Sequence, residues 1–350
     1  MSEAVILFDP WPRTGPLIFT PELRRRFEAL GRIVTVADGE NGPLPPEIVE
    51  ATLPEVFVIV GQTDLPVARL DRARKLKAVI NVEGNFGQNV DYAACFARGV
   101  QVLGVAPAFA LPVAEMALGL ALSLARGIVP GDRSMREGRE QYGLAGNRES
   151  FLLTGATIGL IGCGQLGRVL LPLLRPFHPR LLIHDPWLPA GAIRELHAES
   201  VSLDRVLSEA RVIFVLAGVT AENRGFLSRA KLELIRPDAV FLLMSRADVV
   251  DFEALVGLVE AGRFRAAVDV FPIEPVPAEA RVRRADSLLL SAHRAGGIPQ
   301  AFSRMGEMVV EDLALILAGL PPVSLQAARP ETAGRWRNAP GRSYEPGTRL

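Results

Sequence analysis

The chain has 350 residues, more than one ordinary core holds, which predicts two domains. Hydrophobic residues make up 49% and charged residues 22%, a composition that indicates a globular protein and excludes wholesale disorder. Lys plus Arg and Asp plus Glu are both 39, so no excess positive field exists to attract nucleic acid or an anionic membrane.

Several features that the sequence lacks bear on the cellular compartment of the protein. Cys95 and Cys163 have neither the spacing of a disulfide framework nor that of a zinc site. The N-terminal residues lack the basic start and long apolar stretch of a secretory signal. The most apolar helical segment, Leu111–Ala125, contains Glu115 and is expected to be too short and too polar to span a bilayer. We therefore expect a cytoplasmic protein without a metal site or a membrane span.

Short β-branched runs bounded by Gly, Pro or Asp recur in the first third of the chain, with helical patterns between them. This alternation predicts a parallel sheet with crossover helices. The expected strands are Ala4–Asp9, Ile33–Val36, Val56–Gly61, Ala78–Val82 and Val100–Val105.

The next segment, Leu111–Arg126, has apolar residues all round a helix, with small Ala and Gly residues at several positions. A helix of this kind is buried on all sides, either in a domain junction or against another subunit.

A second series of runs is apolar at every position, as expected of strands covered on both faces. The expected strands are Thr157–Gly162, Arg180–Asp185, Val212–Leu216, Ala239–Met244, Ala266–Val270 and Ser287–Ser291. A helix over Ala301–Ala318 follows, and we expect it to cross back and pack on the first domain. From Pro321 onward the chain is rich in Pro, Arg and Gly, so residues 326–350 are predicted to form an extended or disordered tail.

The first strand of the second series runs into the pattern Gly-x-Gly-x-x-Gly and then a helix. Gly162 permits the tight turn, Gly164 lets backbone approach a pyrophosphate, and Gly167 lets the helix pack on the strand. The free amides and positive dipole end of that helix favour phosphate. The segment therefore predicts a dinucleotide-binding loop.

Asp185 closes the following strand, where its carboxylate can accept hydrogen bonds from ribose hydroxyls and repel a 2′-phosphate. NAD is therefore favoured over NADP. An alternative of another class is a methyltransferase that binds S-adenosylmethionine, which also uses a Gly-rich first turn and an acidic residue after the second strand. The third glycine, Gly167, argues against it.

Arg246, Glu274 and His293 follow later strands, at the edge where open α/β sheets bind ligands. Reduction of a 2-oxo acid needs a hydride donor, a cation for the carboxylate and a proton donor for the carbonyl oxygen. An imidazolium paired with a carboxylate supplies the proton, and a guanidinium binds the substrate carboxylate and polarises the carbonyl. Each residue alone has a structural interpretation, but together they predict a hydride-transfer site for a small 2-oxo acid.

At this point the chain resembles the D-isomer-specific 2-hydroxyacid dehydrogenase family, which includes phosphoglycerate dehydrogenase and glyoxylate/hydroxypyruvate reductase. The resemblance covers about residues 50–320 and is specific, because its motifs occur in family order. These motifs are the loop 162–167, the stretch Thr220–Gly225, Ser245-Arg246, Asp269-Val270-Phe271, Glu274-Pro275, and His293 with Ala295-Gly296.

The resemblance implies an α/β fold of two domains. A Rossmann-type doubly wound parallel sheet over residues 105–294 would bind NAD, inserted in a flavodoxin-like substrate domain formed by residues 1–104 and 295–325. The likeness also implies a homodimer built on the helix near Leu111–Arg126.

Roles for individual residues follow from the same resemblance. Arg246, Glu274 and His293 would be the family's catalytic Arg, Glu and His. Gln165 and Leu166 would touch the pyrophosphate, Asp185 the ribose, Asp269 the nicotinamide amide, and Met244 to Arg246 the nicotinamide half. The full set of expected cofactor contacts is Gly162, Gly164, Gln165, Leu166, Gly167, Asp185, Thr220, Met244, Ser245, Asp269 and Gly296.

The substrate loop departs from the family pattern, which commonly reads Gly-x-Gly before an Asn-hydrophobic-Asp. Here Glu83 precedes Gly84, Asn85 and Phe86, and these last three are the candidate substrate residues. Phe86 occupies the place of the second glycine, so we predict that its ring lines the acyl pocket unless it turns into the core.

Further departures are Ala247, Ala292 and Gly218, where Gly, Pro and Pro are usual. Together they suggest a divergent subgroup with its own substrate. Two other functions stay open: oxidation of another small anion such as phosphite, and a dinucleotide-sensing binding protein like the co-repressors that share this fold.

Overall fold

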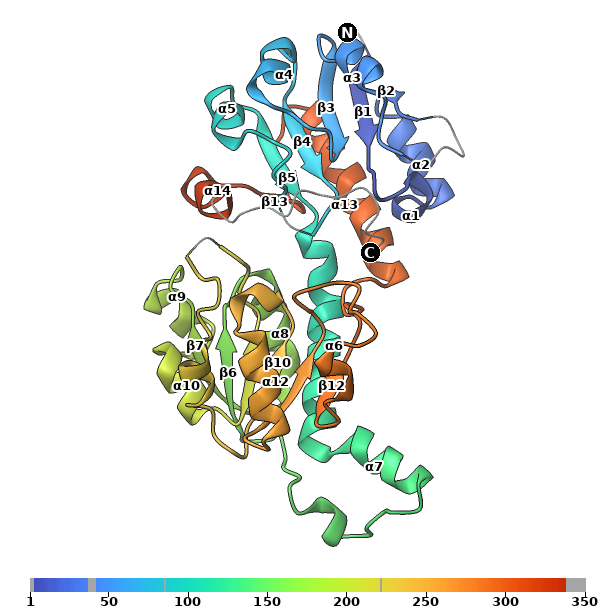
Figure 1. Ribbon diagram of the computed structural model, residues 1–350. Coiled ribbons are helices and arrows are strands. Elements are labelled where there is room, and N and C mark those ends of the chain that lie inside the picture. The colour runs from blue at the N-terminus through green and yellow to red at the C-terminus, as the bar shows by residue number, and fades with distance from the viewer. Residues whose placement is uncertain (1–2, 37–41, 85, 221, 338–350) are drawn as a thin grey trace. The chain divides into compact units, whose positions relative to one another are not determined.

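The computed structural model describes residues 3–36, 42–84, 86–220 and 222–337 (Figure 1). They form two compact units, one running to Phe109 and resuming at Gly297, the other from Ala110 to Gly296. Residues 105–294 were expected in the second domain, so each boundary lies a few residues later than expected. The first turn of the long helix that begins at Ala106 stays with unit 1 because Ala108 is buried in the core of that unit.

Unit 1 contains a six-stranded sheet in the order β13-β5-β4-β3-β1-β2 among the described residues. The strands β2-β1-β3-β4-β5 are parallel and follow the flavodoxin-like order, while β13 is antiparallel to β5. The strands are β1 (Val5–Asp9), β2 (Arg32–Val34), β3 (Val56–Gly61), β4 (Ala78–Asn81), β5 (Gln101–Gly104) and β13 (Gln326–Ala327). The helices are α1 (Gly15–Ile18), α2 (Pro21–Glu28), α3 (Pro46–Thr52), α4 (Val67–Arg72), α5 (Tyr92–Ala97), α13 (Pro299–Leu317) and α14 (Pro330–Arg337).

Unit 2 contains a seven-stranded, wholly parallel sheet in the order β12-β11-β10-β9-β6-β7-β8 within the described part of the chain. Counted from β6, this is the doubly wound Rossmann order, with its switch point between β6 and β9. The strands are β6 (Thr157–Ile161), β7 (Arg180–His184), β8 (Glu199–Ser200), β9 (Val212–Val215), β10 (Val240–Leu243), β11 (Arg265–Val268) and β12 (Leu288–Leu290). The helices are α6 (Ala106–Arg126), α7 (Ile128–Arg136), α8 (Gln165–Leu174), α9 (Ala190–Glu195), α10 (Leu203–Glu209), α11 (Arg229–Leu232) and α12 (Phe252–Glu260), with 3-10 turns at Ala145–Asn147, Arg175–Phe177, Ala247–Val249 and Arg281–Arg284.

Alternating side chains of each central strand build a separate core on each face of the sheet. In β10, Phe241 and Leu243 join the cluster under α12, whereas Val240 and Leu242 join the cluster with α6 and α8. The same division occurs in β1, where Ile6 faces one cluster and Leu7 the other. Strands buried on both faces must be apolar at every position, which is why the run pattern predicted them. The expected α/β fold of two doubly wound sheets is confirmed.

The expected return of the last long helix to the first domain is also confirmed. Met305, Met308 and Val309 of α13 are buried in the same core cluster as Ile6 and Phe8 of β1. Figure 1 shows α13, in orange-red, beside the blue helices α1 and α2. The apolar period of α13 therefore covers one face of the unit 1 sheet.

The expected disordered tail is wrong for residues 326–337, which form β13 and α14. The buried carboxylate of Asp312 accepts hydrogen bonds from the amides of Val323, Ser324 and Leu325, which turns the chain back toward the sheet. Beyond that turn β13 pairs with the edge strand β5, and Ala333 of α14 is buried. Tertiary hydrogen bonds thus order a segment whose composition alone indicated disorder. The remainder of the predicted tail, residues 338–350, lies outside the described residues.

The expectation that the apolar helix is too short to cross a membrane is also corrected. α6 begins at Ala106 and runs for 21 residues, so its length and composition alone would allow a span. However, Ala117, Ala121 and Ala125 are fully buried in the core of unit 2, and core helices of soluble folds pass the same test. The helix therefore gives no indication of a membrane span.

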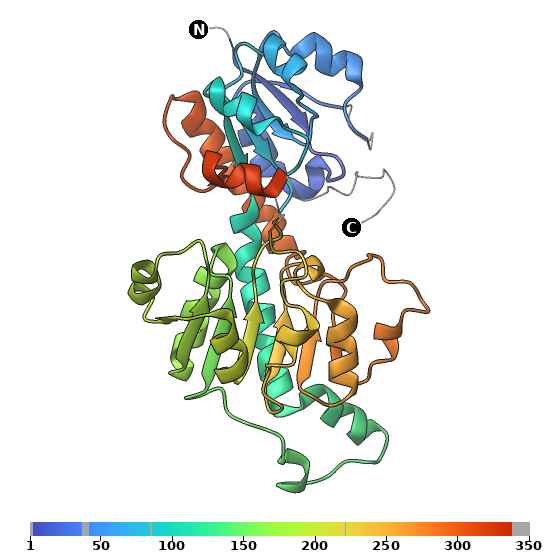
Figure 2. The ribbon, with the colours of Figure 1, turned by 60° about the vertical axis from the view of Figure 1, so that its left-hand side comes forward.

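After α6 the chain leaves the body of unit 2. Figure 2 shows α7 and the segment that follows it, in green, projecting from the end of α6. No residue of α7 is buried, and the segment exposes large apolar side chains at Ile128, Met135, Tyr142 and Leu144.

Candidate active site

The glycine loop connects β6 to α8 at the switch point of the unit 2 sheet. Gly162 has φ of +88°, and a Cβ there would lie 2.7 Å from the backbone of Ala217. A Cβ at Gly164 would meet nothing within 4 Å, so this position is an open cradle beside the N-terminus of α8. Gln165 is the exposed first residue of α8, and Leu166 and the buried Gly167 pack toward the core. An open loop at a helix N-terminus fits a pyrophosphate.

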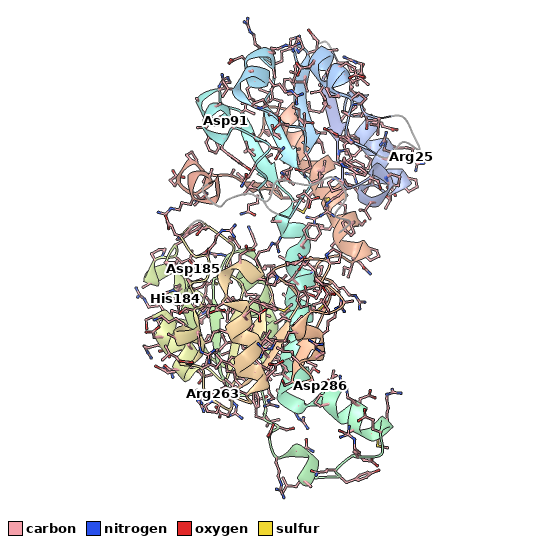
Figure 3. All side chains as sticks on the ribbon, in the orientation of Figure 1. Arg25, Asp91, His184, Asp185, Arg263 and Asp286 are labelled. Atoms are coloured by element: carbon pink, nitrogen blue, oxygen red, sulfur yellow. The ribbon has the colours of Figure 1, made fainter. Side chains whose placement is uncertain are left out.

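Asp185 follows β7 and is tied to this loop. The amide of Cys163 donates to Asp185 Oδ2 at 2.7 Å, and the amide of Trp187 donates to Oδ1 at 2.9 Å. Figure 3 labels Asp185 at one end of the unit 2 sheet, with Arg263 and Asp286 at the opposite end. Both carboxylate oxygens are therefore held by backbone amides beside the glycine loop, an arrangement that fits the residues expected around NAD.

His293 and Glu274 form a hydrogen-bonded pair at the edge that follows β11 and β12. His293 Nδ1 lies 2.7 Å from Glu274 Oε2, and the amide of Phe271 donates to Glu274 Oε1 at 2.8 Å. Although partial burial raises the pKa of Glu274, the hydrogen bonds from His293 and Phe271, with the charges of His293 and Arg246, hold it below its usual value. Glu274 is therefore ionised near neutral pH, and its carboxylate can accept a hydrogen bond from Nδ1 of His293.

The loop that carries His293 is organised by Asp269, whose side chain is 1% exposed. The His293 amide donates to the Asp269 carbonyl, and the amides of Arg294 and Ala295 donate to its two carboxylate oxygens. These bonds hold His293 at φ of +51°, in the left-handed region that few residues other than glycine adopt. Asp269 thus positions the histidine loop, a role that the sequence did not predict beside the expected contact with nicotinamide.

Arg246 follows β10, and its Nη1 donates to the carbonyl of Ser245 at 2.7 Å. The positive charge of Arg246 helps to lower the pKa of Glu274. The three expected catalytic residues therefore interact electrostatically. Ser245 is buried, and its hydroxyl has no hydrogen-bond partner among the described residues. An unsatisfied buried hydroxyl beside Arg246 fits a polar group of the cofactor. Met244 is buried in the core, so only its backbone is available to a ligand.

Two other expected cofactor contacts lie on loops of the same unit. The buried Thr220 accepts a hydrogen bond from the amide of Glu222, and its own amide donates to Asn223 Oδ1, so it serves a turn after β9. Gly296 is the last described residue of unit 2, directly after the loop that Asp269 organises.

The expected substrate residues belong to unit 1, whereas the catalytic trio belongs to unit 2. Gly84 follows β4 at the carboxyl edge of its sheet, and Asn85 lies outside the described residues. The partly buried ring of Phe86 meets Tyr92 edge-on at 6.4 Å between centroids, and a Cβ at Gly104 would lie 3.3 Å from it. These contacts favour the core interpretation of Phe86 over the pocket interpretation.

Replacing Phe86 with glycine is expected to lower the free energy of unfolding by about 2 to 4 kcal/mol, since a partly buried ring is lost and a cavity is left. The kcat/KM ratio between a larger and a smaller 2-oxo acid should stay at the wild-type value. Urea unfolding and steady-state kinetics measure the two quantities, with Phe86→Leu as a control that retains most of the stability. A tenfold change in the kcat/KM ratio without loss of stability would show that Phe86 lines the substrate pocket.

Besides the role of Asp269, sequence reasoning missed two further features of these sites. The bond between Cys163 and Asp185 is a backbone contact that leaves no residue pattern. The pair of Arg13 with Glu83 joins residues from two loops of unit 1, far apart in the chain. The two residues of each pair are too far apart in the sequence for a short motif to reveal the contact.

The geometry defines a class of protein. A doubly wound sheet with a glycine loop, a ribose-type aspartate and a His–Glu pair at one edge is the arrangement of a dinucleotide-dependent oxidoreductase. Comparison with known proteins supplies the family. Residues 118–295 match the profile described as "D-isomer specific 2-hydroxyacid dehydrogenase, NAD binding domain".

Individual relatives agree with that profile. The chain is 28% identical over 292 residues to a glyoxylate reductase of Pyrococcus horikoshii, covering 81% of this chain and 87% of the relative. It is 27% identical over 271 residues to a D-3-phosphoglycerate dehydrogenase of Archaeoglobus fulgidus, covering 76% of this chain but only 50% of the relative, so it spans about half of that protein.

Among solved structures, a phosphoglycerate oxidoreductase from Rhizobium etli is 40% identical, with a TM-score of 0.83 and coverage of 93% of this chain and 98% of that chain. The chain therefore belongs to the D-isomer specific 2-hydroxyacid dehydrogenase family, and NAD is its cofactor.

Proposed function

We propose that this chain transfers a hydride between NAD(H) and a small 2-oxo acid, giving the D-2-hydroxy acid. The observation that carries the proposal is the His293–Glu274 hydrogen bond of 2.7 Å at the carboxyl edge of the NAD-binding sheet. The names of the relatives support it, since both glyoxylate reductase and phosphoglycerate dehydrogenase act on such acids.

In the proposed mechanism, NADH held by the glycine loop and Asp185 would supply the hydride that reduces the substrate carbonyl. His293, protonated on both ring nitrogens, donates the Nε2 proton to the carbonyl oxygen, and Glu274 stabilises the imidazolium through Nδ1. Arg246 binds the substrate carboxylate and polarises the carbonyl. The reverse reaction uses neutral His293 as the base that removes the hydroxyl proton.

The other expected cofactor contacts complete the proposed site. Gly162, Gly164, Gln165, Leu166 and Gly167 would hold the pyrophosphate, and Asp185 the ribose. Thr220, Met244, Ser245, Asp269 and Gly296 would surround the nicotinamide half. Gly84 and its neighbours after β4 would give backbone amides to the substrate carboxylate, with unit 1 as the substrate domain.

Turnover of NADH with a panel of 2-oxo acids tests the proposal, and oxidation of NADH by at least one of them is the expected result. Reduction of NAD by phosphite, with no turnover of any oxo acid, would instead support the oxidation of another anion. Tight NADH binding without turnover of any substrate would favour a dinucleotide-sensing protein.

Purified protein is expected to bind NADH at least about tenfold more tightly than NADPH, because the carboxylate of Asp185 repels a 2′-phosphate. Its two backbone hydrogen bonds prevent the carboxylate from turning away. Fluorescence titration measures the dissociation constants for both cofactors. Asp185→Asn should bring the ratio of the two constants closer to one. Equal affinities in the wild type would show that Asp185 does not select the cofactor.

We further propose that the protein is a cytoplasmic homodimer that uses α6 and the projecting segment after it. The exposed side chains of Ile128, Met135, Tyr142 and Leu144 support this, because apolar residues gathered on a projecting arm mark interaction surfaces. Light scattering by the purified chain measures the oligomeric state directly.

A further inference from the structure

A cation and an anion that the proposed mechanism does not use meet at the carboxyl edge of the unit 1 sheet. Arg13 lies in the turn after β1, and Glu83 lies in the loop after β4, directly before the expected substrate residue Gly84. Arg13 Nη2 lies 3.0 Å from Glu83 Oε2. Open parallel sheets bind ligands at this edge, so the pair is located where a substrate would approach unit 1.

The Arg13 guanidinium is held on several sides. Its Nε donates to the carbonyl of Val82 at 2.8 Å, and its face lies over the rings of Phe109 and Phe302 at 5.5 and 5.1 Å. Its side chain is only 15% exposed. Aromatic faces and partial burial strengthen its attraction to an anion, so Arg13 is a fixed anchor for Glu83.

The backbone of the loop is fixed as well. The Glu83 amide donates to Asn81 Oδ1, which also accepts a hydrogen bond from Gln62 Nε2. The backbone of Glu83 is therefore held by Asn81, and its carboxylate is held by Arg13. A carboxylate constrained in this way presents a preorganised acceptor at the loop, instead of one that swings freely into solvent.

The chemistry of the pair limits what it can recognise. An ionised carboxylate only accepts hydrogen bonds, so a group beside Glu83 must donate one. Arg13 Nη1 has no hydrogen bond within the described residues and can donate to the same group. A hydroxyl donates and accepts at once, whereas a phosphate dianion only accepts and would be repelled by Glu83.

We propose that the Arg13–Glu83 pair determines substrate specificity by selecting 2-oxo acids that carry a neutral hydroxyl at the far end over their phosphate esters. The inference rests on the proposed function, because it assumes that a 2-oxo acid approaches the loop after β4. It names a narrower substrate class for the same site.

The test compares kcat/KM for hydroxypyruvate and for 3-phosphohydroxypyruvate in the wild type and in Glu83→Gln. Wild type should prefer hydroxypyruvate, and Glu83→Gln should shift the ratio toward the ester by about tenfold or more, because the repulsive charge is gone while the shape is kept. Glu55→Gln is the matched control: Glu55 forms an exposed ion pair with Lys75 in the same unit, so its loss should leave the ratio unchanged.

Each outcome decides the inference. An unchanged ratio in a Glu83→Gln protein that binds NADH and melts like wild type would overturn it and assign the pair a structural role. A wild-type preference for the ester would overturn it as well, even where the variant fails to fold. Turnover of neither acid nor any other 2-oxo acid would instead refute the proposed function, and the inference with it.

Discussion

Replacing His293 with alanine is expected to lower kcat for the preferred 2-oxo acid by about 100-fold to 10,000-fold, the range that general acid catalysis contributes. The affinity for NADH should stay close to the wild-type value, because the glycine loop and Asp185 are separate from the histidine loop. Stopped-flow or steady-state kinetics measure the first quantity, and fluorescence titration measures the second.

The chain contains a matched control for this change. His178, like His293, has a positive φ, so His178→Ala places alanine in the same strained backbone region without touching the candidate catalytic edge. It lies in the exposed turn before β7, at the opposite end of the strands. Near-normal turnover in His178→Ala and lost turnover in His293→Ala would separate chemistry from folding. Near-normal turnover in both would remove His293 as the proton donor.

Glu274→Gln is expected to lower kcat/KM by about 100-fold, because an amide cannot stabilise the imidazolium that donates the proton. It should also change the pH dependence of stability. The folded-state pKa of Glu274 lies below its usual value, so its ionised form stabilises the fold at neutral pH and this contribution is lost as the pH falls through the lowered pKa. The difference in unfolding free energy between wild type and variant should therefore be largest near neutral pH and shrink in acid.

Urea unfolding at a series of pH values measures that difference. Glu279→Gln serves as the control, since Glu279 is exposed in the same loop and its loss should alter neither kinetics nor pH dependence. A difference that stays constant from neutral to acidic pH would mean that Glu274 stabilises the fold only through shape and not through its charge.

The position of the candidate catalytic group could be predicted because parallel strands place their carboxyl ends at one edge. Arg246, Glu274 and His293 each follow an apolar run, so locating the strands was enough to bring these residues to the same side of the sheet. The hydrogen bond between His293 and Glu274, the orientation of each ring and carboxylate, and the low pKa of Glu274 required the coordinates.

The sequence by itself determined the features that depend on local spacing. These features are the glycine loop, Asp185 at the end of β7 and the alternation of apolar runs. Each is a pattern of a few residues, so it can be interpreted from the sequence without the fold. The two doubly wound sheets followed from that alternation, because fully apolar strands must be covered on both faces.

Only the tertiary structure decided the features that depend on contacts between distant segments. Among them are the contact of Phe86 with Tyr92 and the ion pair of Arg13 with Glu83. The hydrogen bonds by which Asp269 holds the histidine loop are another example. The tertiary structure also ordered β13 and α14 through the buried Asp312, against a composition typical of disorder. Composition and periodicity report what a segment prefers alone, whereas these outcomes depend on which buried donors and apolar surfaces other segments present to it.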